Sequence, residues 1–384
     1  MKNKIISITI CAFIAICSIF ISYFTPQNVA YANTESMFCS AKSMCLIEGN
    51  SGRIILEKNK DMKLAMASVT KIITAITAIE NSSDDLDKKY VVPDKAIGIE
   101  GTSMYLKKGE ELTKRELLYG LMLPSGNDAA TALALLTCDT EEEFCGLMKQ
   151  TCEKVGAINS NFVNAHGLDA DGHYTTAYDL ALVTAYALNN PVFLEVSKTK
   201  NIMIEATNQY DVRYLRNKNK LLLNNENCIG VKTGFTDNAG RCFVSATDQN
   251  NMKMVCVVLN CGPMFEESAS CLEFANTKYS MQNILTANKY ITSLPVQYGD
   301  KNFARIYNES SFCYPLSESE LENLSIERIL PEKIDAPLDI GDVVGQINIF
   351  IDKDLIFSSN LCSIDKVEKI DKFDKFEDIL DKWI

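Results

Sequence analysis

The sequence predicts an α+β protein in which helices pack on an antiparallel sheet, followed by a small all-β domain and a terminal amphipathic helix. Helical apolar spacing dominates the first half, and the strand-like segments GVKTGFT, RCFVSATD and MKMVCVVLN then follow one another between residues 230 and 260. Helices in the first half of the chain, followed by a run of antiparallel strands, predict a fold in which layers of helix pack on a sheet. Beyond about residue 283, short strand-like runs separated by Gly, Pro and Asp are typical of an all-β domain.

The 384 residues are long enough for two domains with cores of their own. A formal net charge of −12 argues against a nucleic-acid partner, because binding phosphates requires clustered Lys and Arg side chains. We expect four parts, which are a signal peptide at 1–32, a main domain at 33–282, a C-terminal β-domain at 283–364 and an amphipathic helix at 365–384.

The N-terminus has the pattern of a signal peptide. Lys2 and Lys4 form a basic start, residues 5–24 are an uncharged apolar stretch, and Ala30-Tyr31-Ala32 supplies the small-x-small pattern of a cleavage site. The apolar stretch is also long enough for a membrane span, but the A-x-A pattern after it favours cleavage. We therefore expect an exported, mature chain.

Two of the fourteen cysteines, Cys11 and Cys17, lie in this N-terminal segment. The other twelve show no C-x-x-C pair and no regular disulfide framework. Cys138, Cys145 and Cys152 recur every seven residues in what the pattern predicts to be one helix. Seven helical residues rise about 10 Å, which is beyond the reach of a disulfide, so these three cannot pair with each other. We interpret the mature cysteines as packed, reduced thiols.

The elements of the main domain can be predicted in order. Residues 43–59 predict a hairpin, because two apolar runs flank a Gly-Asn-Ser-Gly turn. A helix follows, with apolar positions at Val69, Ile72, Ile73, Ile76 and Ile79. Residues 113–137 predict a helix, a Pro-Ser-Gly-Asn break and a second helix. Residues 175–189 predict another helix, with Thr175 or Thr176 as its N-cap.

The pattern S-x-x-K occurs three times, at Ser68, Ser197 and Ser363, about as often as chance allows. Only Ser68 opens a long apolar helix, and residues three apart on a helix share a face. The positive end of the helix dipole favours an oxyanion and a neutral Lys71 there. This placement makes Ser68 and Lys71 candidates for a nucleophile and its base.

Two rarer patterns occur once each. Ser125-Gly126-Asn127 lies in the break between helices, and Lys232-Thr233-Gly234 lies on a strand-like run. In the order S-x-x-K, S-x-N, K-T-G, the three motifs resemble those of the active-site serine penicillin-recognising enzymes. Within that superfamily the chain resembles the D-alanyl-D-alanine carboxypeptidases, which are low-molecular-mass penicillin-binding proteins. The segments at 162–181, 230–247 and 330–356 are similar to that family's connecting segments and C-terminal β-domain.

The resemblance implies a β-lactamase/transpeptidase-like catalytic domain and a serine D,D-peptidase mechanism without cofactor or metal. Ser68 would attack the peptide bond between two D-alanines and form an acyl-enzyme. Lys71 would be the base, which requires a pKa lowered by burial and by a nearby cation such as Lys232. Ser125 would pass a proton to the leaving D-alanine.

The remaining motif residues would bind the substrate. Asn127 would hold a substrate amide, and Lys232 with Thr233 would bind the terminal carboxylate. Gly234 has no side chain, so the substrate could lie against its strand. The family's oxyanion hole uses two backbone N–H groups, here those of Ser68 and Phe235.

The implied partners are peptidoglycan pentapeptides ending in D-alanyl-D-alanine, and β-lactam antibiotics as covalent inhibitors. We expect the mature protein on the outer face of the cytoplasmic membrane, in the cell wall space. The tail has an apolar stripe spaced three to four residues apart, formed by Val367, Ile370, Phe373, Phe376, Leu380 and Trp383. Such a helix could pack on the protein or lie on a membrane surface, and we expect the second.

Other interpretations stay open. A β-lactamase would share the acylation step, but class A enzymes use an E-x-x-x-N pair that is absent between Asn127 and Lys232. A non-catalytic penicillin-binding sensor or scaffold would not need every motif residue intact. His166 and His173 are the only histidines, and without H-E-x-x-H we interpret them as loop-ordering residues rather than zinc ligands. Many relatives carry an arginine where this chain has Met264, which affects the expected carboxylate site.

Overall fold

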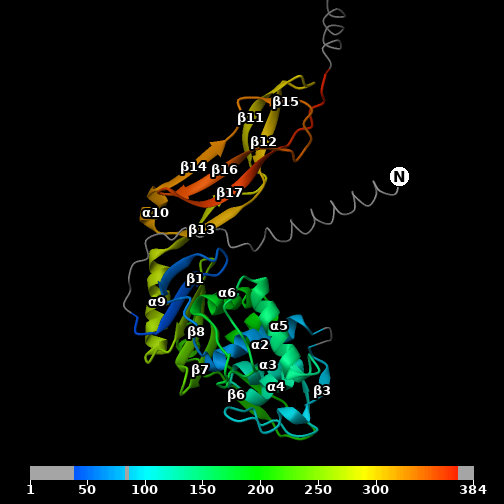
Figure 1. The fold of residues 1–384 in the computed structure, drawn as a ribbon, viewed down its shortest axis with the longest axis vertical. Helices are drawn as coiled ribbons and strands as arrows, with labels where there is room; N and C mark the ends of the chain where they lie inside the picture. The colour runs from blue at the N-terminus through cyan, green and yellow to red at the C-terminus, as the bar shows by residue number, and fades with distance from the viewer. Residues whose placement is uncertain (1–38, 83–85, 371–384) are drawn as a thin grey trace, which may run out of the picture. The chain divides into compact units, whose positions relative to one another are not determined.

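The computed structural model describes residues 39–82 and 86–370, and the predicted signal peptide at 1–32 lies outside them. The described chain divides into two compact units, one ending at Thr277 and the other beginning at Lys278 (Figure 1). Within the described residues, no helix combines the length and apolar character needed to cross a membrane.

A five-stranded antiparallel sheet forms the centre of the first unit. Its order is β2 (Ile54–Lys58), β1 (Ser43–Glu48), β9 (Met252–Leu259), β8 (Gly240–Gln249) and β7 (Cys228–Thr236). The predicted hairpin of β1 and β2 and the predicted antiparallel run of β7, β8 and β9 are confirmed. Asn250 and Asn251 join β8 to β9 with φ of 52° and 62°, a left-handed conformation that Asn tolerates better than most residues.

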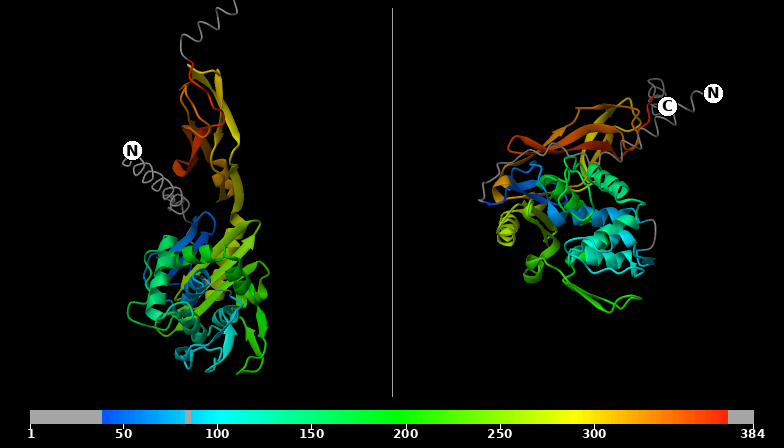
Figure 2. Two further views of the ribbon diagram at one scale, coloured as in Figure 1. Left: turned by 90° about the vertical axis from the view of Figure 1, so that its right-hand side faces the viewer. Right: turned by 60° about the horizontal axis from the view of Figure 1, so that its bottom comes forward.

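Helices cover both faces of this sheet (Figures 1 and 2). On one face lie α2 (Lys71–Glu80), α3 (Lys114–Met122), α4 (Asn127–Leu135), α5 (Glu141–Lys154), α6 (Ala177–Ala187) and α7 (Pro191–Lys198). Val255 and Val257 of β9 are fully buried in the core that these helices share with the sheet. The helix α9 (Met264–Lys278) packs on the other face, where Asn276 donates a hydrogen bond to Thr247 of β8. The sheet is therefore sandwiched between helical layers.

N-capping residues determine where several of the helices begin. The helix–break–helix of α3 and α4 is confirmed, and Thr176 is the N-cap of α6, accepting a hydrogen bond from the Asp179 N–H. One prediction was wrong, because Cys138 does not share a helix with Cys145 and Cys152. Thr140 forms a capping box with Glu143, so that α5 begins only at Glu141.

Short elements that the sequence patterns did not predict line the edge of the first unit. Two small antiparallel pairs are β3 (Lys89–Val91) with β4 (Glu111–Thr113), and β5 (Asn201–Ile204) with β6 (Arg213–Arg216). Three single-turn or short helices are η1 (Ala67–Thr70), η2 (Asp94–Ala96) and α8 (Lys220–Asn224).

The second unit is built mainly of strands, as predicted. A six-stranded sheet has the order β14 (Leu324–Ile329), β16 (Val343–Ile351), β17 (Asp354–Ser363), β12 (Phe303–Asn308), β11 (Tyr290–Gln297) and β15 (Ile334–Asp335). A second pair joins β10 (Ser280–Leu285) to β13 (Phe312–Leu316), and one short helix, α10 (Glu318–Glu322), connects β13 to β14. The core includes Ala304, Ile306, Ile347, Ile349 and Leu361.

The predicted amphipathic helix does not begin at residue 365. Val367 pairs with Leu338 in an extended bridge and is completely buried, and the N–H of Ile370 donates to the carbonyl of Tyr298. The backbone groups of this stretch are satisfied by strand pairing, which a helix would break. The rest of the predicted helix, residues 371–384, lies outside the described residues.

The twelve cysteines from Cys39 to Cys362 are all free thiols in the structure. All of them are buried except Cys138 and Cys313. This agrees with our interpretation of the mature cysteines as packed thiols.

Candidate active site

Ser68 lies in the 3-10 turn η1, directly before α2, where Lys71 is the first residue. The helix therefore begins three residues later than the pattern predicted. Ala67 has a φ of 50°, a strained conformation for a residue other than glycine, so the turn that presents Ser68 departs from ordinary helix geometry. Ser68 remains half-buried, whereas Lys71 is fully buried.

The amine of Lys71 has three partners. Its Nζ lies 3.0 Å from Ser68 Oγ, 2.7 Å from Asn127 Oδ1 and 2.5 Å from the carbonyl oxygen of His166. The oxygens of Asn127 and His166 can only accept a hydrogen bond, whereas the serine hydroxyl can also donate one. A neutral amine has two N–H groups and one lone pair. It therefore satisfies all three partners when its lone pair faces the hydroxyl of Ser68.

Asn127 begins α4, and its side-chain amide is oriented by the protein itself. Its Nδ2 donates to the carbonyl of Glu100 at 2.6 Å, so Oδ1 must face Lys71. Its backbone N–H donates to the carbonyl of Thr102 at 2.7 Å. The amide thus binds the base and a neighbouring loop, and one N–H and one lone pair remain for any substrate.

Ser125 lies in the break between α3 and α4. Its φ is 72°, and its carbonyl accepts a short hydrogen bond from the Thr102 hydroxyl. The side chain is buried, and its Oγ has no hydrogen-bond partner among the described residues. A strained residue with an unpaired buried hydroxyl is a candidate for a functional role.

The K-T-G motif lies in the middle of β7. Lys232 is 2% exposed, and its Nζ donates to the carbonyl of Thr233 at 2.9 Å. A Cβ on Gly234 would lie 3.0 Å from the backbone nitrogens of Ser68 and Val69. Gly234 is therefore needed for the close approach of β7 to the turn that carries Ser68. The next side chain, Phe235, is 63% exposed.

The electrostatics favour a neutral base. Burial, and then the charges of Lys232 and Lys218, hold the pKa of Lys71 well below its ordinary value. Burial, and then the charge of Lys218, lower the pKa of Lys232 to about 7. Lys218 was not identified from the sequence. No motif marks it, and the asparagines beside it have structural contacts, since Asn219 caps α8 and Asn217 donates to Thr199.

The two histidines order the loop that supplies the carbonyl of residue 166. Nδ1 of His173 accepts from the Val163 N–H at 3.1 Å, and its Nε2 lies 3.0 Å from the hydroxyl of Thr70. That hydroxyl already donates to Ala67, so it accepts from Nε2–H, and the imidazole is neutral. Burial is the main cause of the low pKa, about 4, of both His166 and His173.

The next residue of this loop is Gly167, which has a φ of 87°. A Cβ there would lie 2.1 Å from the carbonyl oxygen of Ala67, so only glycine allows the loop to approach the serine turn. The described residues contain no group of three or more His, Cys, Asp or Glu side chains that could hold a metal ion.

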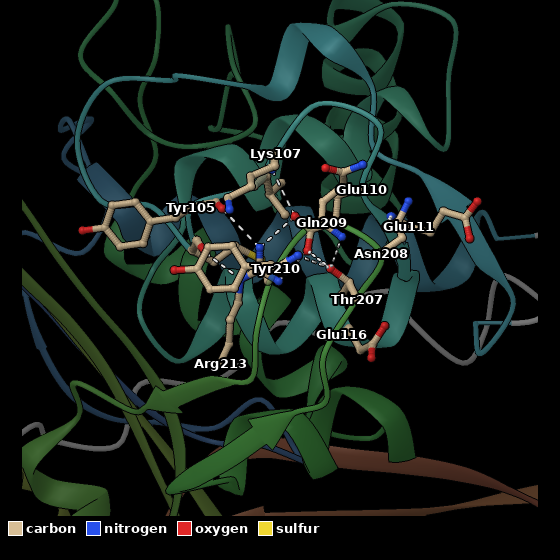
Figure 3. Close-up of polar contacts among 12 residues, drawn as sticks. Tyr105, Lys107, Glu110, Glu111, Glu116, Thr207, Asn208, Gln209, Tyr210 and Arg213 are labelled. Atoms are coloured by element: carbon tan, nitrogen blue, oxygen red, sulfur yellow. Dashed lines mark hydrogen bonds and ion pairs between the residues drawn. The ribbon is translucent and has the colours of Figure 1, made fainter.

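A buried ion pair supports the loop at 100–106, which contacts Ser125 and Asn127 (Figure 3). Glu110 and Arg213 are joined by two hydrogen bonds of 2.6 and 2.7 Å, and both side chains are at most 4% exposed. Arg213 also donates to the carbonyls of Met104 and Tyr105. Its guanidinium lies 3.8 Å from the ring centre of Tyr210, so the hairpin of β5 and β6 clamps this loop.

The same loop is also bound by Asp128, which follows Asn127 in α4. Its carboxylate accepts from the N–H groups of Met104 and Leu106 and from the hydroxyl of Ser103. Asp128 and Arg213 therefore hold the loop between them. Neither residue was identified from the sequence, because the contacts join segments far apart in the chain.

The other two S-x-x-K serines have structural partners. Ser197 is fully buried in α7 and donates to the carbonyl of Ile229, and Ser363 donates to the carbonyl of Asp365. The structure therefore brings together Ser68, Lys71 and Asn127 by hydrogen bonds, with Gly234 in close backbone approach.

Comparisons with known proteins show which family the chain belongs to. Residues 30–262 match the family model described as D-alanyl-D-alanine carboxypeptidase, and residues 279–369 match that of the penicillin-binding protein 5 C-terminal domain. The chain is 28% identical to the carboxypeptidase DacF of Bacillus subtilis, with 85% of each chain covered. It is 30% identical to DacC of Escherichia coli, over 86% of this chain and 85% of the relative.

A solved structure supports the same assignment. Penicillin-binding protein 5 of Haemophilus influenzae has a TM-score of 0.77 and 25% identity to this chain, and the match covers 88% of this chain and 100% of that one. The first family model alone spans more than half of the sequence. The chain therefore belongs to the D-alanyl-D-alanine carboxypeptidase family of penicillin-binding serine peptidases.

Proposed function

We propose that Ser68 carries the acyl group in this D-alanyl-D-alanine carboxypeptidase and that Lys71 is its general base. The observation that supports this most strongly is the environment of the Lys71 amine. Its two acceptor-only partners and its depressed pKa leave a lone pair for the hydroxyl of Ser68 at 3.0 Å. A protonated amine would have a third N–H instead, and it could not take the serine proton.

In the acylation step, the proton of Ser68 passes to Lys71 while Oγ bonds to the carbonyl carbon between the two D-alanines. The oxyanion is stabilised by the N–H groups of Ser68 and Phe235. The C–N bond then breaks, and the leaving D-alanine takes a proton through the hydroxyl of Ser125, whose side chain has no other partner among the described residues. Water attacks the acyl-enzyme with Lys71 again as base, and Ser68 is regenerated.

Lys232 and Thr233 bind the terminal carboxylate of the substrate in this proposal. Charge on Lys232 is disfavoured in the free enzyme, since its pKa is about 7, and an incoming carboxylate would stabilise it. Asn127 uses its remaining N–H or lone pair for a substrate amide. Gly234 has no side chain, so it leaves room for the substrate along β7. Peptidoglycan pentapeptides are the substrates, and β-lactams acylate the same serine as inhibitors.

We also propose the division of the chain and its location. Residues 1–32 are a signal peptide, 33–282 the catalytic domain, 283–364 the β-domain, and the tail to residue 384 attaches the protein to the outer face of the cytoplasmic membrane. The observed extended pairing of Val367 moves the start of this attachment segment beyond Ile370.

Mass spectrometry after exposure to penicillin tests the assignment of the nucleophile. We expect one penicilloyl adduct on Ser68, together with release of D-alanine from a soluble peptide ending in D-alanyl-D-alanine. Ser68→Ala should abolish both, whereas the control Ser270→Ala, at an exposed position of α9, should change neither. An adduct on Ser197 or Ser363 would refute the proposal. Rapid loss of the adduct without peptide turnover would instead indicate a β-lactamase.

A further inference from the structure

Two thiols in the first unit share one carboxylate oxygen. Sγ of Cys39 lies 2.9 Å, and Sγ of Cys261 3.1 Å, from Oε2 of Glu267. Both cysteines are free and buried, with exposed fractions of 2% and 1%. Each thiol also affects the pKa of the other. The sulfurs are therefore neighbours, although the residues are 222 positions apart in the sequence.

The fold brings these cysteines together through the sheet. Cys39 precedes β1, and Cys261 follows β9, the antiparallel neighbour of β1 with Ser43 opposite Leu259. The N–H of Lys42 continues this pairing by donating to the carbonyl of Leu259 at 3.1 Å. The strand register therefore brings the two thiols together, because the hydrogen bonds between β1 and β9 continue almost to both cysteines.

Glu267 completes the cluster from the first turns of α9. Its two carboxylate oxygens also accept from the backbone N–H of Ser40, at 3.1 and 3.0 Å. The carboxylate thus anchors the chain just before β1 and holds both thiols at one oxygen. No residue of this cluster belongs to the proposed catalytic site.

The two thiols differ in acidity. The hydrogen bond from Cys261 is the main cause of the lowered pKa of Cys39, and the same contact raises the pKa of Cys261. Because the thiolate is the reactive form of cysteine, Cys39 is the better nucleophile of the pair. Cys261 is placed to act second, as the resolving thiol.

We propose that Cys39 and Cys261 form an intramolecular disulfide by exchange with low-molecular-mass disulfides, and that this bond stabilises the first unit. The Cys39 thiolate attacks one sulfur of the small disulfide, whose other sulfur leaves as a thiolate and takes up a proton. Cys261 then loses its proton to solvent and attacks the Cys39 sulfur of the mixed disulfide, and the second small thiolate leaves and takes up a proton. Overall, two protein thiols and one small disulfide become one protein disulfide and two small thiols. The proposal does not rest on the catalytic roles given above, and the proposed export would expose the pair to such oxidants.

A second pair of thiols provides an internal comparison. Cys271 of α9 is the main cause of the raised pKa of Cys256 in β9, and the two side chains have exposed fractions of 1% and 0%. The neighbours of Cys256 in β9, Val255 and Val257, are fully buried as well. By contrast, Ser40 beside Cys39 and Gly262 beside Cys261 are both exposed. A small oxidant can therefore reach the Cys39–Cys261 pair through a local opening before β1, whereas the second pair requires the sheet and helix to separate.

The bond would close a loop that contains Ser68, Lys71, Ser125 and Lys232. A cross-link that closes a long loop reduces the conformational freedom of the unfolded chain, so it stabilises the folded unit. We expect the catalytic residues to keep their positions, since both thiols already contact the same carboxylate oxygen in the reduced protein. We therefore expect a higher Tm and unchanged turnover.

The test uses the purified chain with Cys313→Ser, which removes the exposed thiol and thus intermolecular links. The reduced protein is incubated with oxidised glutathione and analysed by intact mass, by peptide mapping without reduction, and by thermal unfolding. We expect loss of two hydrogens, a Cys39–Cys261 linked peptide, and a Tm raised by about 5 °C or more. Cys261→Ser should retain one glutathione on Cys39, and Cys39→Ser should lose both the link and the rise in Tm.

Cys256→Ser with Cys271→Ser is the matched control, and the Cys39–Cys261 link should persist in it. A link between any other two cysteines, or no link at all after prolonged incubation with excess oxidised glutathione, would overturn the proposal. A correct link with an unchanged Tm would overturn its stabilising role. D-alanine release is measured in parallel, so a failure of the catalytic assignment would be recognised separately from a failure of the thiol pair.

Discussion

The carbonyl oxygen of His166 lies 2.5 Å from Nζ of Lys71, although 95 residues separate them in the sequence. A carbonyl can only accept, so this contact takes one of the N–H groups of the amine. Asn127 takes another at 2.7 Å. The lone pair of a neutral amine is thereby directed to Ser68, so in the proposed mechanism the loop around residue 166 orients the base through its backbone.

Lys71→Arg should be inactive although it keeps a positive charge. A guanidinium stays protonated at any pH at which the protein is folded, so it cannot accept the serine proton. Loss of a general base typically costs about 10²–10⁴-fold, and we expect the rate of penicilloyl formation on Ser68 to fall by that amount. Lys149→Arg, on the exposed side of α5, is the control and should acylate normally. Near-normal acylation of the Lys71 variant would show that another group is the base.

Asn127→Asp should move the acid limb of the pH–rate profile to higher pH. The new carboxylate would lie within hydrogen-bond distance of the Lys71 amine and would favour its protonated form. Because the base must be neutral, a higher pH is then needed for the same fraction of active enzyme. The measurement is kcat/KM for D-alanine release across pH, with Asn127→Ala as the uncharged comparison. An acid limb that stays in place in the aspartate variant would contradict the assignment of Lys71 as base.

Lys232 should determine the alkaline limb of the same profile. Its pKa of about 7 means that the cation is lost as pH rises through neutrality, and carboxylate binding is weakened with it. We expect kcat/KM to fall as pH rises through neutrality. The alkaline limb of the kcat profile should lie at higher pH, because the bound carboxylate stabilises the positive charge of Lys232. Lys218→Met removes a neighbouring cation and should raise the pKa of Lys232, which shifts this limb upward. An unchanged limb in that variant would exclude coupling between the two lysines.

How much of this site could be predicted depends on the kind of contact. The three-residue spacing of Ser68 and Lys71 predicted their proximity, because the geometry of one turn determines it. The carbonyl of His166 could not be predicted, since every residue has a carbonyl and only the folded loop brings this one to the amine. The pairing of Glu110 with Arg213 was equally hidden, because it joins segments 103 residues apart. Motifs thus predicted which residues lie together, and tertiary structure supplied the groups that orient them.

The tail shows the same limit of prediction from sequence. The spacing of Val367 and Ile370 is compatible with a helix, and the sequence alone predicted one. In the structure Val367 pairs with Leu338, and Ile370 bonds to Tyr298, so strand pairing overrides the helical spacing. Local periodicity could not reveal these partners.

Replacing only one residue of the Glu110–Arg213 pair should lower the free energy of unfolding more than removing both charges. Arg213→Met leaves a buried carboxylate without its partner, which typically costs about 3–5 kcal/mol of unfolding free energy. The double variant Arg213→Met with Glu110→Gln should recover a large part of that loss. Urea unfolding of the wild type, both single variants and the double variant measures the coupling. Equal and additive losses would show that the pair contributes no mutual stabilisation.

The same variants should affect catalysis through the loop that contacts Ser125 and Asn127. Arg213 binds the carbonyls of Met104 and Tyr105, so its loss should loosen that loop and lower kcat. Arg213→Lys, which keeps the charge but not the forked geometry, should recover stability more fully than kcat. Unchanged kcat in all folded variants would limit the pair to a structural role.

Two truncations should separate the role of the tail in the β-domain from its role at a membrane. Deleting 371–384 leaves the buried Val367 and its bridge to Leu338 in place, whereas deleting 366–384 removes both. We therefore expect the longer deletion to lower the Tm of the β-domain and the shorter one to leave it unchanged. Val367→Ala in the full-length chain is the matched control and should reproduce part of the loss, about 1–3 kcal/mol for a buried apolar side chain.

The shorter deletion alone tests attachment. It removes Phe373, Phe376, Leu380 and Trp383, the part of the apolar stripe that lies beyond the paired stretch, together with five acidic residues that anionic lipids repel. Binding should therefore be peripheral, extractable by high salt or alkaline carbonate, and lost on deletion of 371–384. Flotation with vesicles of anionic lipid measures it, while hydrolysis of a soluble peptide should stay at the wild-type rate. If the chain without 371–384 still floats with the vesicles, the tail is not the attachment segment, and another apolar surface of the protein must bind the lipid.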